Sequence, residues 1–178
     1  MQLGLIGKTL KHSFSKKYFA EKFSKLDLHC HSYSSFELAT IDEFTGLLQN
    51  NPWLTGLNVT IPYKTAIIPY IDSLSAEAEK INAVNTIKII GGKLYGYNTD
   101  VYGFTQSIKP LLKPAHRKAL ILGTGGASKA VAYSLHKLGI DYTKVSRNPS
   151  SEEIGYEEAS IHLKDYQVVV NTTPLGTY

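Results

Sequence analysis

A glycine-rich turn between an apolar strand pattern and a helical pattern constrains the fold of this chain more than any other feature. Residues 119–122 form a short apolar run, residues 123–128 contain three glycines, and residues 130–138 have a helical pattern. A second apolar run follows at residues 142–145. Strand, helix and strand in this order predict a β-α-β unit of a Rossmann-type fold.

The backbone amides of this turn suit a pyrophosphate group. The first glycine permits a tight turn, the second lets the backbone approach phosphate closely, and the dipole of the following helix favours negative charge. Ser128 stands where the usual pattern has a third glycine, which predicts slightly looser packing of helix on strand. A glycine turn without a ligand is the alternative. We expect a dinucleotide to contact Gly123, Gly125, Gly126, Ala127 and Ser128.

The residues that follow the second strand indicate which dinucleotide is bound. Folds that bind NAD carry an acidic residue about 20 residues beyond the turn, where it holds the ribose hydroxyl. This strand instead runs into Ser146, Arg147 and Asn148. A guanidinium can pair with a 2′-phosphate through two charge-assisted hydrogen bonds. The sequence therefore favours NADP, with Ser146 and Asn148 as supporting donors, although Arg147 as a solvated turn residue is the alternative.

The first hundred residues alternate between strand and helix patterns, which predicts a mainly parallel α/β substrate domain. We expect strands at residues 2–6, 28–36, 56–61, 83–90 and 93–98, and helices from residue 15 and at residues 41–49, 64–70, 76–81 and 101–112. Two prolines and a basic stretch then mark a domain boundary. The expected domains are residues 1–100, a connection at residues 101–117, and an incomplete Rossmann-type domain at residues 118–178.

Polar residues gather at the ends of the expected strands. Ser13 and Ser15 precede the first helix, where their hydroxyls suit a carboxylate, although simple capping of the helix is the alternative. Asn58 and Thr60 alternate with apolar neighbours and therefore share a strand face, and Pro62 turns the chain towards a helix that contains Lys64. Two further polar groups lie beside apolar strands, at residues 83–86 and 96–100, although turns with a purely structural role are the alternative.

Together with residues 171–176, these motifs resemble the shikimate dehydrogenase family in order and spacing, over essentially the whole chain. The resemblance implies the reversible, NADPH-dependent reduction of 3-dehydroshikimate to shikimate, a reaction of chorismate and aromatic amino acid biosynthesis. It implies that Ser13 and Ser15 bind the shikimate carboxylate and that Lys64 and Asp100 are the catalytic pair. It also implies that the ring hydroxyls are surrounded by Asn58, Thr60, Lys64, Asn85 and Asp100, and that NADP contacts include Thr172.

The chain departs from the family pattern in two places. Lys16 follows the second serine where proline is common, so the helix start is expected to be less rigid. Family members also continue well beyond the position of Tyr178 and return a glutamine to the substrate, so we expect the second domain to be incomplete. Two alternatives therefore stay open. One is a quinate/shikimate dehydrogenase that uses NAD, and the other is a fragment that binds shikimate without catalysis.

Composition argues against several other classes of function. Nineteen Lys and Arg residues against fifteen Asp and Glu give a net charge of +4, which does not imply a nucleic-acid partner. No apolar run is long enough for a membrane span. The single cysteine, Cys30, suits a reducing, cytoplasmic location. His29 and His31 lack a second ligand cluster, so no metal is expected, and tyrosines such as Tyr33 are assigned to packing. We expect a monomer or a homodimer.

Overall fold

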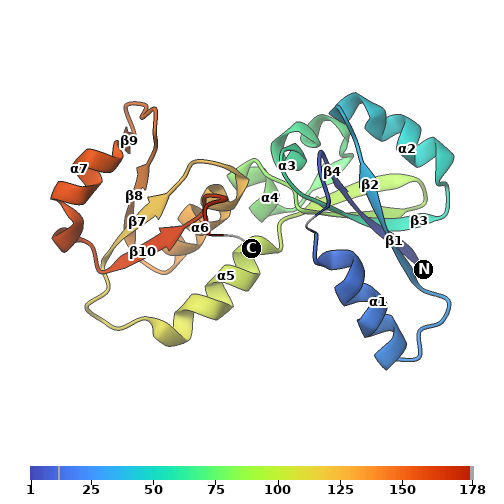
Figure 1. The fold of residues 1–178 in the computed structure, drawn as a ribbon, viewed down its shortest axis with the longest axis horizontal. Coiled ribbons are helices and arrows are strands. Elements are labelled where there is room, and N and C mark those ends of the chain that lie inside the picture. Colours follow the sequence, from blue (N-terminus) through green and yellow to red (C-terminus); the bar gives the residue numbers. More distant parts are fainter. Residues whose placement is uncertain (12, 177–178) are drawn as a thin grey trace. The chain divides into compact units, whose positions relative to one another are not determined.

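The computed structural model describes residues 1–11 and 13–176. These residues divide into two compact units, with the boundary between Asn98 and Thr99. Both units combine a sheet with helices, so the α/β class is confirmed (Figure 1). Within the described residues, no helix is both long and apolar enough to cross a bilayer.

The first unit is built on a six-stranded mixed sheet with the strand order β2-β1-β3-β5-β6-β4. Strand β1 pairs in parallel with both β2 and β3, whereas β5 runs antiparallel to β3 and β6. The elements are β1 (Gln2–Gly7), α1 (Ser15–Lys25), β2 (Ser32–Glu37), a 3-10 turn (Ile41–Glu43), α2 (Phe44–Asn50), β3 (Leu54–Val59), α3 (Tyr63–Ala66), a second 3-10 turn (Ile68–Tyr70), β4 (Ser73–Leu74), α4 (Ala76–Ile81), β5 (Thr86–Ile90) and β6 (Lys93–Tyr97).

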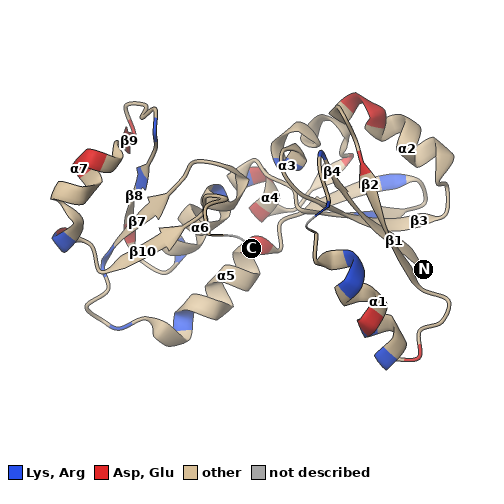
Figure 2. Cartoon of the chain, in the orientation of Figure 1, with Lys and Arg blue, Asp and Glu red and all other residues tan. Residues whose placement is uncertain are grey.

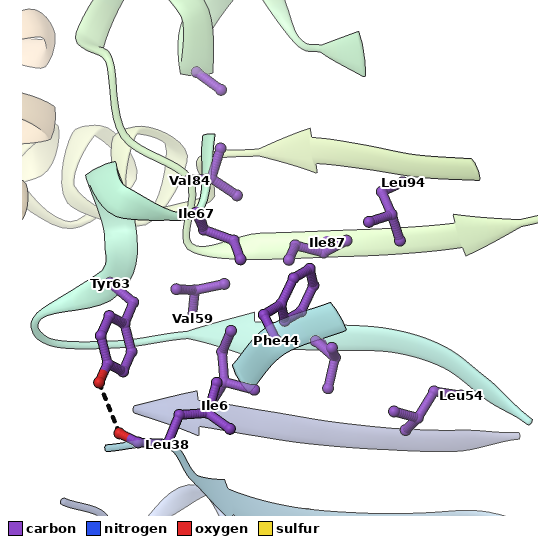
Figure 3. Packing of buried hydrophobic residues seen from close by; sticks show 12 residues of the cluster. Ile6, Leu38, Phe44, Leu54, Val59, Tyr63, Ile67, Val84, Ile87 and Leu94 are labelled. Atoms are coloured by element: carbon purple, nitrogen blue, oxygen red, sulfur yellow. Dashed lines mark hydrogen bonds between the residues drawn. The ribbon is translucent and has the colours of Figure 1, made fainter. Parts of the chain in front are cut away.

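The alternation of side chains along β1 and β3 divides the first unit into two apolar cores. Ile6 and Val59 point to one face, where they pack with Phe44 of α2 and with buried side chains of the following segments (Figure 3). Leu5 points to the other face and packs with Tyr33 and with the partly buried Phe19 of α1. Figure 1 accordingly shows α1 and α2 on opposite sides of this sheet. The period-two pattern of the strands thus fixes which side chains face α1.

The second unit contains a four-stranded, fully parallel sheet with the order β10-β7-β8-β9. Its elements are α5 (Asp100–Ile108), a 3-10 turn (Lys109–Leu111), β7 (Lys118–Leu122), α6 (Gly126–Lys137), β8 (Asp141–Val145), β9 (Glu153–Ile154), α7 (Tyr156–Ile161), a further 3-10 turn (Leu163–Asp165) and β10 (Val168–Asn171). Strands β7 and β8 joined through α6 are the β-α-β unit that the glycine turn predicts.

Helix α6 holds the second unit together by packing on the sheet and on α5. Its buried Val131 and Leu135 lie against Ile121 of β7 and the partly buried Phe104 of α5. The hydroxyl of Ser134, which is also buried, donates to the carbonyl oxygens of Ala130 and Val101 at 2.9 and 3.3 Å. The buried Ser134 hydroxyl therefore has hydrogen-bond partners in both α5 and α6, as buried polar groups generally require.

Most predicted elements are confirmed, although several have shifted boundaries, such as β3 (Leu54–Val59 against the predicted 56–61) and β5 (Thr86–Ile90 against 83–90). The second strand begins at Ser32 instead of residue 28, because Asp27 adopts a positive φ of 53° and His31 N–H donates to the Leu28 carbonyl, which closes a turn there. Helix α6 begins at Gly126 instead of residue 130, because glycine and small residues provide its first turn. Strands β4 and β9 have two residues each, too few to show a period in the sequence.

Candidate active site

The predicted substrate residues of the first unit lie at one edge of its sheet. Because β1 and β3 are parallel, their carboxyl ends meet at this edge, and the antiparallel β5 begins there. Asn58 of β3 is paired directly with Thr86 of β5 and with Leu5 of β1. Asn85 precedes β5 and is buried, and its carbonyl accepts the Val59 N–H at 2.9 Å. The pairing of β1, β3 and β5 therefore brings together polar residues that lie far apart in the sequence.

The start of α1 adds two hydroxyls to this unit. Helix α1 begins at Ser15, whose N–H donates to Ser13 Oγ at 3.3 Å. Ser13 therefore uses its oxygen as an acceptor, which leaves the hydroxyl proton for another partner. The first turn contains no acidic residue, and it contains Lys16 and Lys17, both exposed (Figure 2). The positive end of the helix dipole and two ammonium groups together favour a bound anion.

Asn58 links the strands through its side chain. Its Oδ1 accepts the Tyr33 hydroxyl at 2.8 Å, and its Nδ2 donates to Thr86 Oγ1 at 3.3 Å and to the Asn85 carbonyl at 3.4 Å. Thr86 Oγ1 in turn donates to Asn85 Oδ1 at 2.9 Å. These bonds join the two amide side chains in one hydrogen-bonded network.

Thr60 and Lys64 lie on either side of a tight connection after β3. Thr60 N–H donates to the Ile6 carbonyl at 2.9 Å, and the Ile61–Pro62 peptide that follows is cis. Helix α3 is anchored by Tyr63, which is buried and donates its hydroxyl to the Leu38 carbonyl at 2.7 Å (Figure 3). The Lys64 carbonyl accepts Val84 N–H at 2.7 Å, so the half-buried lysine is tied to the segment that leads to Asn85.

Asp100 lies in the second unit, where it is the first residue of α5. This agrees with its predicted position near a helix start. The carboxylate is the acidic group of the first helical turn, where the helix dipole favours negative charge. Asp100 is half-buried, and the following Val101 is buried. The Val101 carbonyl accepts the Ser134 hydroxyl at 3.3 Å, which ties the helix start to α6 of the same unit.

The glycine turn of the second unit joins β7 to α6, as predicted. Gly123 has a φ of +104°, and a Cβ atom there would lie only 3.0 Å from Thr172 Oγ1. Gly125 precedes the helix, and a Cβ atom there would meet nothing within 4 Å, so a ligand can approach its backbone. Gly126 and Ala127 form the first helical positions, and Ser128 is fully buried with no hydrogen-bond partner for Oγ among the described residues. An open backbone at a helix start fits a phosphate.

The remaining predicted cofactor residues lie at the carboxyl ends of β8 and β10. Ser146 follows β8, and its hydroxyl oxygen accepts the Asn148 N–H at 3.3 Å, which closes a small turn around the exposed Arg147. Thr172 follows β10, and its hydroxyl donates to the Leu122 carbonyl at 2.7 Å at the end of β7. Because these strands are parallel, both groups share the sheet edge from which the glycine turn departs.

Sequence reasoning missed two groups of this site. The sequence assigns Tyr33 to packing, and the structure adds a hydrogen bond from its hydroxyl to Asn58. Thr86 belongs to one of the polar motifs without a predicted role, yet it links Asn58 with Asn85. The alternation of polar and apolar residues in β2 could have indicated which face Tyr33 occupies. Its partner depends on the strand order, which no local pattern encodes.

The histidines near Cys30 lie in the turn before β2 and not on a strand face. Among the residues that the structure describes, no group of three or more His, Cys, Asp or Glu side chains could hold a metal ion.

A polar strand-end site in one unit and a glycine turn of the dinucleotide type in the other together fit the class of dinucleotide-dependent oxidoreductases. Comparison with known proteins specifies the family. Residues 5–87 match the family model described as shikimate dehydrogenase substrate binding domain. The shikimate dehydrogenase (NADP(+)) of Clostridium botulinum is 37% identical over 185 residues, an alignment that covers 97% of this chain and 71% of that protein.

Two solved structures agree with this assignment. Shikimate dehydrogenase 1 of Peptoclostridium difficile has a TM-score of 0.85 and 37% identity, with 99% of this chain and 68% of that chain covered. Shikimate 5-dehydrogenase of Thermus thermophilus, solved in complex with NADP(H) and shikimate, has a TM-score of 0.84 and 30% identity, with 97% and 68% covered. The chain belongs to the shikimate dehydrogenase family.

Proposed function

We propose that this chain carries out the reversible reduction of 3-dehydroshikimate to shikimate with NADPH as the reductant. The observation that carries the proposal is the gathering of Ser13, Ser15, Asn58, Thr60, Lys64 and Asn85 in a unit whose sequence matches the family's substrate-binding domain. In this proposal the first unit binds shikimate and the second unit binds NADP.

The carboxylate of the substrate is assigned to Ser13 and Ser15. Two hydroxyls two residues apart can each donate to one carboxylate oxygen, and a hydrogen bond to a charged group contributes about 1.5–3 kcal/mol. Lys16 and Lys17 add long-range attraction at the same helix start. The arrangement selects an anionic substrate over a neutral one.

The ring hydroxyls are assigned to the polar groups at the carboxyl end of β3 and the start of β5. Asn58, Thr60 and Asn85 supply both donors and acceptors, which is what a ring with several hydroxyl groups requires. Because the amides of Asn58 and Asn85 are held by the bonds to Tyr33 and Thr86, the site is organised before substrate arrives. Preorganisation reduces the entropy that binding must overcome.

Reduction of the carbonyl group requires a hydride at carbon and a proton at oxygen. NADP in its reduced form supplies the hydride when bound. The ammonium of Lys64 donates to the carbonyl oxygen and stabilises the negative charge that develops there. Asp100 is assigned as the acceptor of the hydrogen bond from the ring hydroxyl. In this proposal Lys64 and Asp100 are the catalytic pair, and the proton moves in the opposite direction during oxidation of shikimate.

The second unit is assigned to NADP. The open backbone at Gly125 and the uncapped start of α6 suit the pyrophosphate. Arg147, with Ser146 and Asn148 in the same turn, is assigned to the 2′-phosphate, because no carboxylate stands there to hold a free ribose hydroxyl. Thr172 lies at the same sheet edge, where its hydroxyl donates to the Leu122 carbonyl. We further propose a cytoplasmic monomer or homodimer, with which the single cysteine is compatible.

Steady-state rates with shikimate or quinate and NADP+ or NAD+ test the proposal. The shikimate and NADP+ pair should be the fastest of the four combinations. A preference for quinate with NAD+ would favour a quinate/shikimate dehydrogenase instead. Shikimate binding by calorimetry with no reduction of either cofactor would favour a binding protein without turnover.

Lys64→Ala tests the catalytic assignment separately. Loss of general acid catalysis should lower turnover by about 100-fold or more, with little change in the Michaelis constant. Lys80→Ala, at an exposed position in α4 of the same unit, is the matched control and should leave turnover unchanged. Unchanged turnover in Lys64→Ala would remove Lys64 from the mechanism.

A further inference from the structure

We infer that Tyr33 is a positioning residue of the shikimate pocket, which sets affinity for shikimate by holding the Asn58 side chain through a hydrogen bond across the intervening strand. The inference rests on the proposed function and adds a residue to it. It concerns the ring hydroxyl side of the pocket and assigns no contact between Tyr33 and the reacting carbonyl.

The ring of Tyr33 is fixed by packing on one face of the sheet. Tyr33 is 7% exposed and belongs to the apolar cluster with Leu5 and Leu10. It stacks on Phe19 of α1, with ring centroids 4.4 Å apart and an interplanar angle of 10°. A buried ring that is stacked in this way has little freedom to move, which limits the positions that its hydroxyl can take.

The sheet register explains why this hydroxyl reaches Asn58. Tyr33 pairs with Leu3 of β1, and Asn58 of β3 pairs with Leu5 of β1. Residues 3 and 5 of one strand share a face, so Tyr33 and Asn58 lie on the same face with β1 between them. The tyrosine side chain spans this distance, and its hydroxyl donates to Asn58 Oδ1 at 2.8 Å.

This bond and the Asn85 carbonyl together hold the Asn58 amide with Oδ1 toward Tyr33 and Nδ2 toward β5. With Oδ1 directed at Tyr33, Nδ2 donates to the Asn85 carbonyl and to Thr86 Oγ1. Thr86 then donates to Asn85 Oδ1, so the orientation of Asn85 depends on that of Asn58. Without the tyrosine hydroxyl, the amide of Asn58 loses its donor and can rotate, which disturbs the contact with Thr86.

The hydroxyl stays protonated at neutral pH and can therefore donate. Burial raises the pKa of Tyr33 to about 12, and a hydrogen bond with the side chain of Ser15 partly opposes this shift. The hydroxyl therefore keeps the proton that it donates to Asn58 Oδ1.

Calorimetric titration of shikimate into Tyr33→Phe tests the inference. The substitution keeps the stacked ring and removes one buried hydrogen bond, which should weaken shikimate binding about 3-fold to 10-fold. In steady-state assays the Michaelis constant should rise by a similar factor while turnover changes less than about twofold. Tyr70→Phe is the matched control, because Tyr70 also donates to a side chain of the first unit, Asp42 at 3.1 Å, and should leave shikimate affinity unchanged.

A double-mutant cycle with Asn58→Ala separates positioning from general packing. If Tyr33 acts through Asn58, Tyr33→Phe should change shikimate affinity less than about 1.5-fold in the Asn58→Ala background. An equal effect in both backgrounds would overturn the inference. If Tyr33→Phe does not fold, Thr86→Val replaces it, because this variant removes the bonds of Thr86 to Asn58 and Asn85. Unchanged shikimate affinity in Thr86→Val would also overturn the inference.

The wild-type titration distinguishes this inference from the proposed function. Failure of the unmodified chain to bind shikimate would overturn both. Binding by the unmodified chain with the same affinity in Tyr33→Phe would overturn the role of Tyr33 alone.

Discussion

Replacement of Gly123 by alanine should damage both the stability of the second unit and its affinity for NADP+. The residue has a φ of +104°, which alanine rarely adopts, and its Cβ would lie 3.0 Å from Thr172 Oγ1 and 3.1 Å from Thr173 Cγ2. Gly139, at the other end of α6, is the matched control. It also has a positive φ, +70°, but a Cβ there would meet no atom within 4 Å.

The difference between the two positions gives the expected magnitude. Forcing an L residue into the left-handed region costs roughly 1–2 kcal/mol, and this term applies to both variants. Overpacking against the Thr172 and Thr173 side chains adds about 1–3 kcal/mol at Gly123 alone. We therefore expect Gly123→Ala to lose about 2–5 kcal/mol of unfolding free energy, against about 1–2 kcal/mol for Gly139→Ala.

Thermal unfolding and calorimetric titration with NADP+ measure the two effects. In a unit of this size each 1 kcal/mol lowers Tm by roughly 4–8 °C, so the two variants are easily resolved. NADP+ affinity should fall about tenfold in Gly123→Ala because the displaced turn misplaces the amides that bind phosphate, and it should be unchanged in Gly139→Ala. Equal affinities in the two variants would refute the assignment of this turn to the pyrophosphate.

Three further variants test other parts of the account. Arg147→Ala should weaken NADP+ binding about tenfold and leave NAD+ binding unchanged by calorimetry, whereas Arg117→Ala, an exposed arginine before β7, should affect neither. Ser13→Ala should weaken shikimate binding about tenfold, because a charge-assisted bond is lost, and Ser24→Ala near the other end of α1 should not. Since burial raises the pKa of Tyr33 from 10.0 to about 12, the folded state holds that proton more tightly than the unfolded state. Unfolding free energy should then fall by roughly 2 kcal/mol between pH 10 and 12, a decline that denaturant titrations should find reduced in Tyr33→Phe.

The parts of the fold that local patterns encode could be predicted from the sequence. The turn at residues 123–128 predicted the β-α-β unit because glycines, a preceding apolar run and a following helical pattern are all local features. A helix was predicted near residues 76–81, and the observed α4 is Ala76–Ile81, where Ser75 caps the helix by accepting the Ala78 N–H at 3.2 Å. The alternation around Asn58 predicted a strand there, but β3 ends at Val59, so Thr60 lies beyond the strand instead of sharing its face.

The parts that depend on strand order could not be predicted. The contact between Tyr33 and Asn58 requires β1 to lie between β2 and β3 in a particular register, and neither strand carries that information alone. Ser128 is buried because of how α6 packs on the sheet, and the sequence motif alone does not determine that packing. The two-residue strands β4 and β9 form because neighbouring strands offer them partners.

A crystal structure of the chain with bound shikimate would show directly whether Ser13, Ser15, Asn85 and Lys64 contact the substrate. The account predicts carboxylate oxygens about 2.5–3.0 Å from Ser13 Oγ and Ser15 Oγ, with ring hydroxyls against Asn85 and Lys64. Shikimate bound instead in the shallow cavity between α1 and β2, lined by residues such as Phe23, Leu28 and His31, would contradict it.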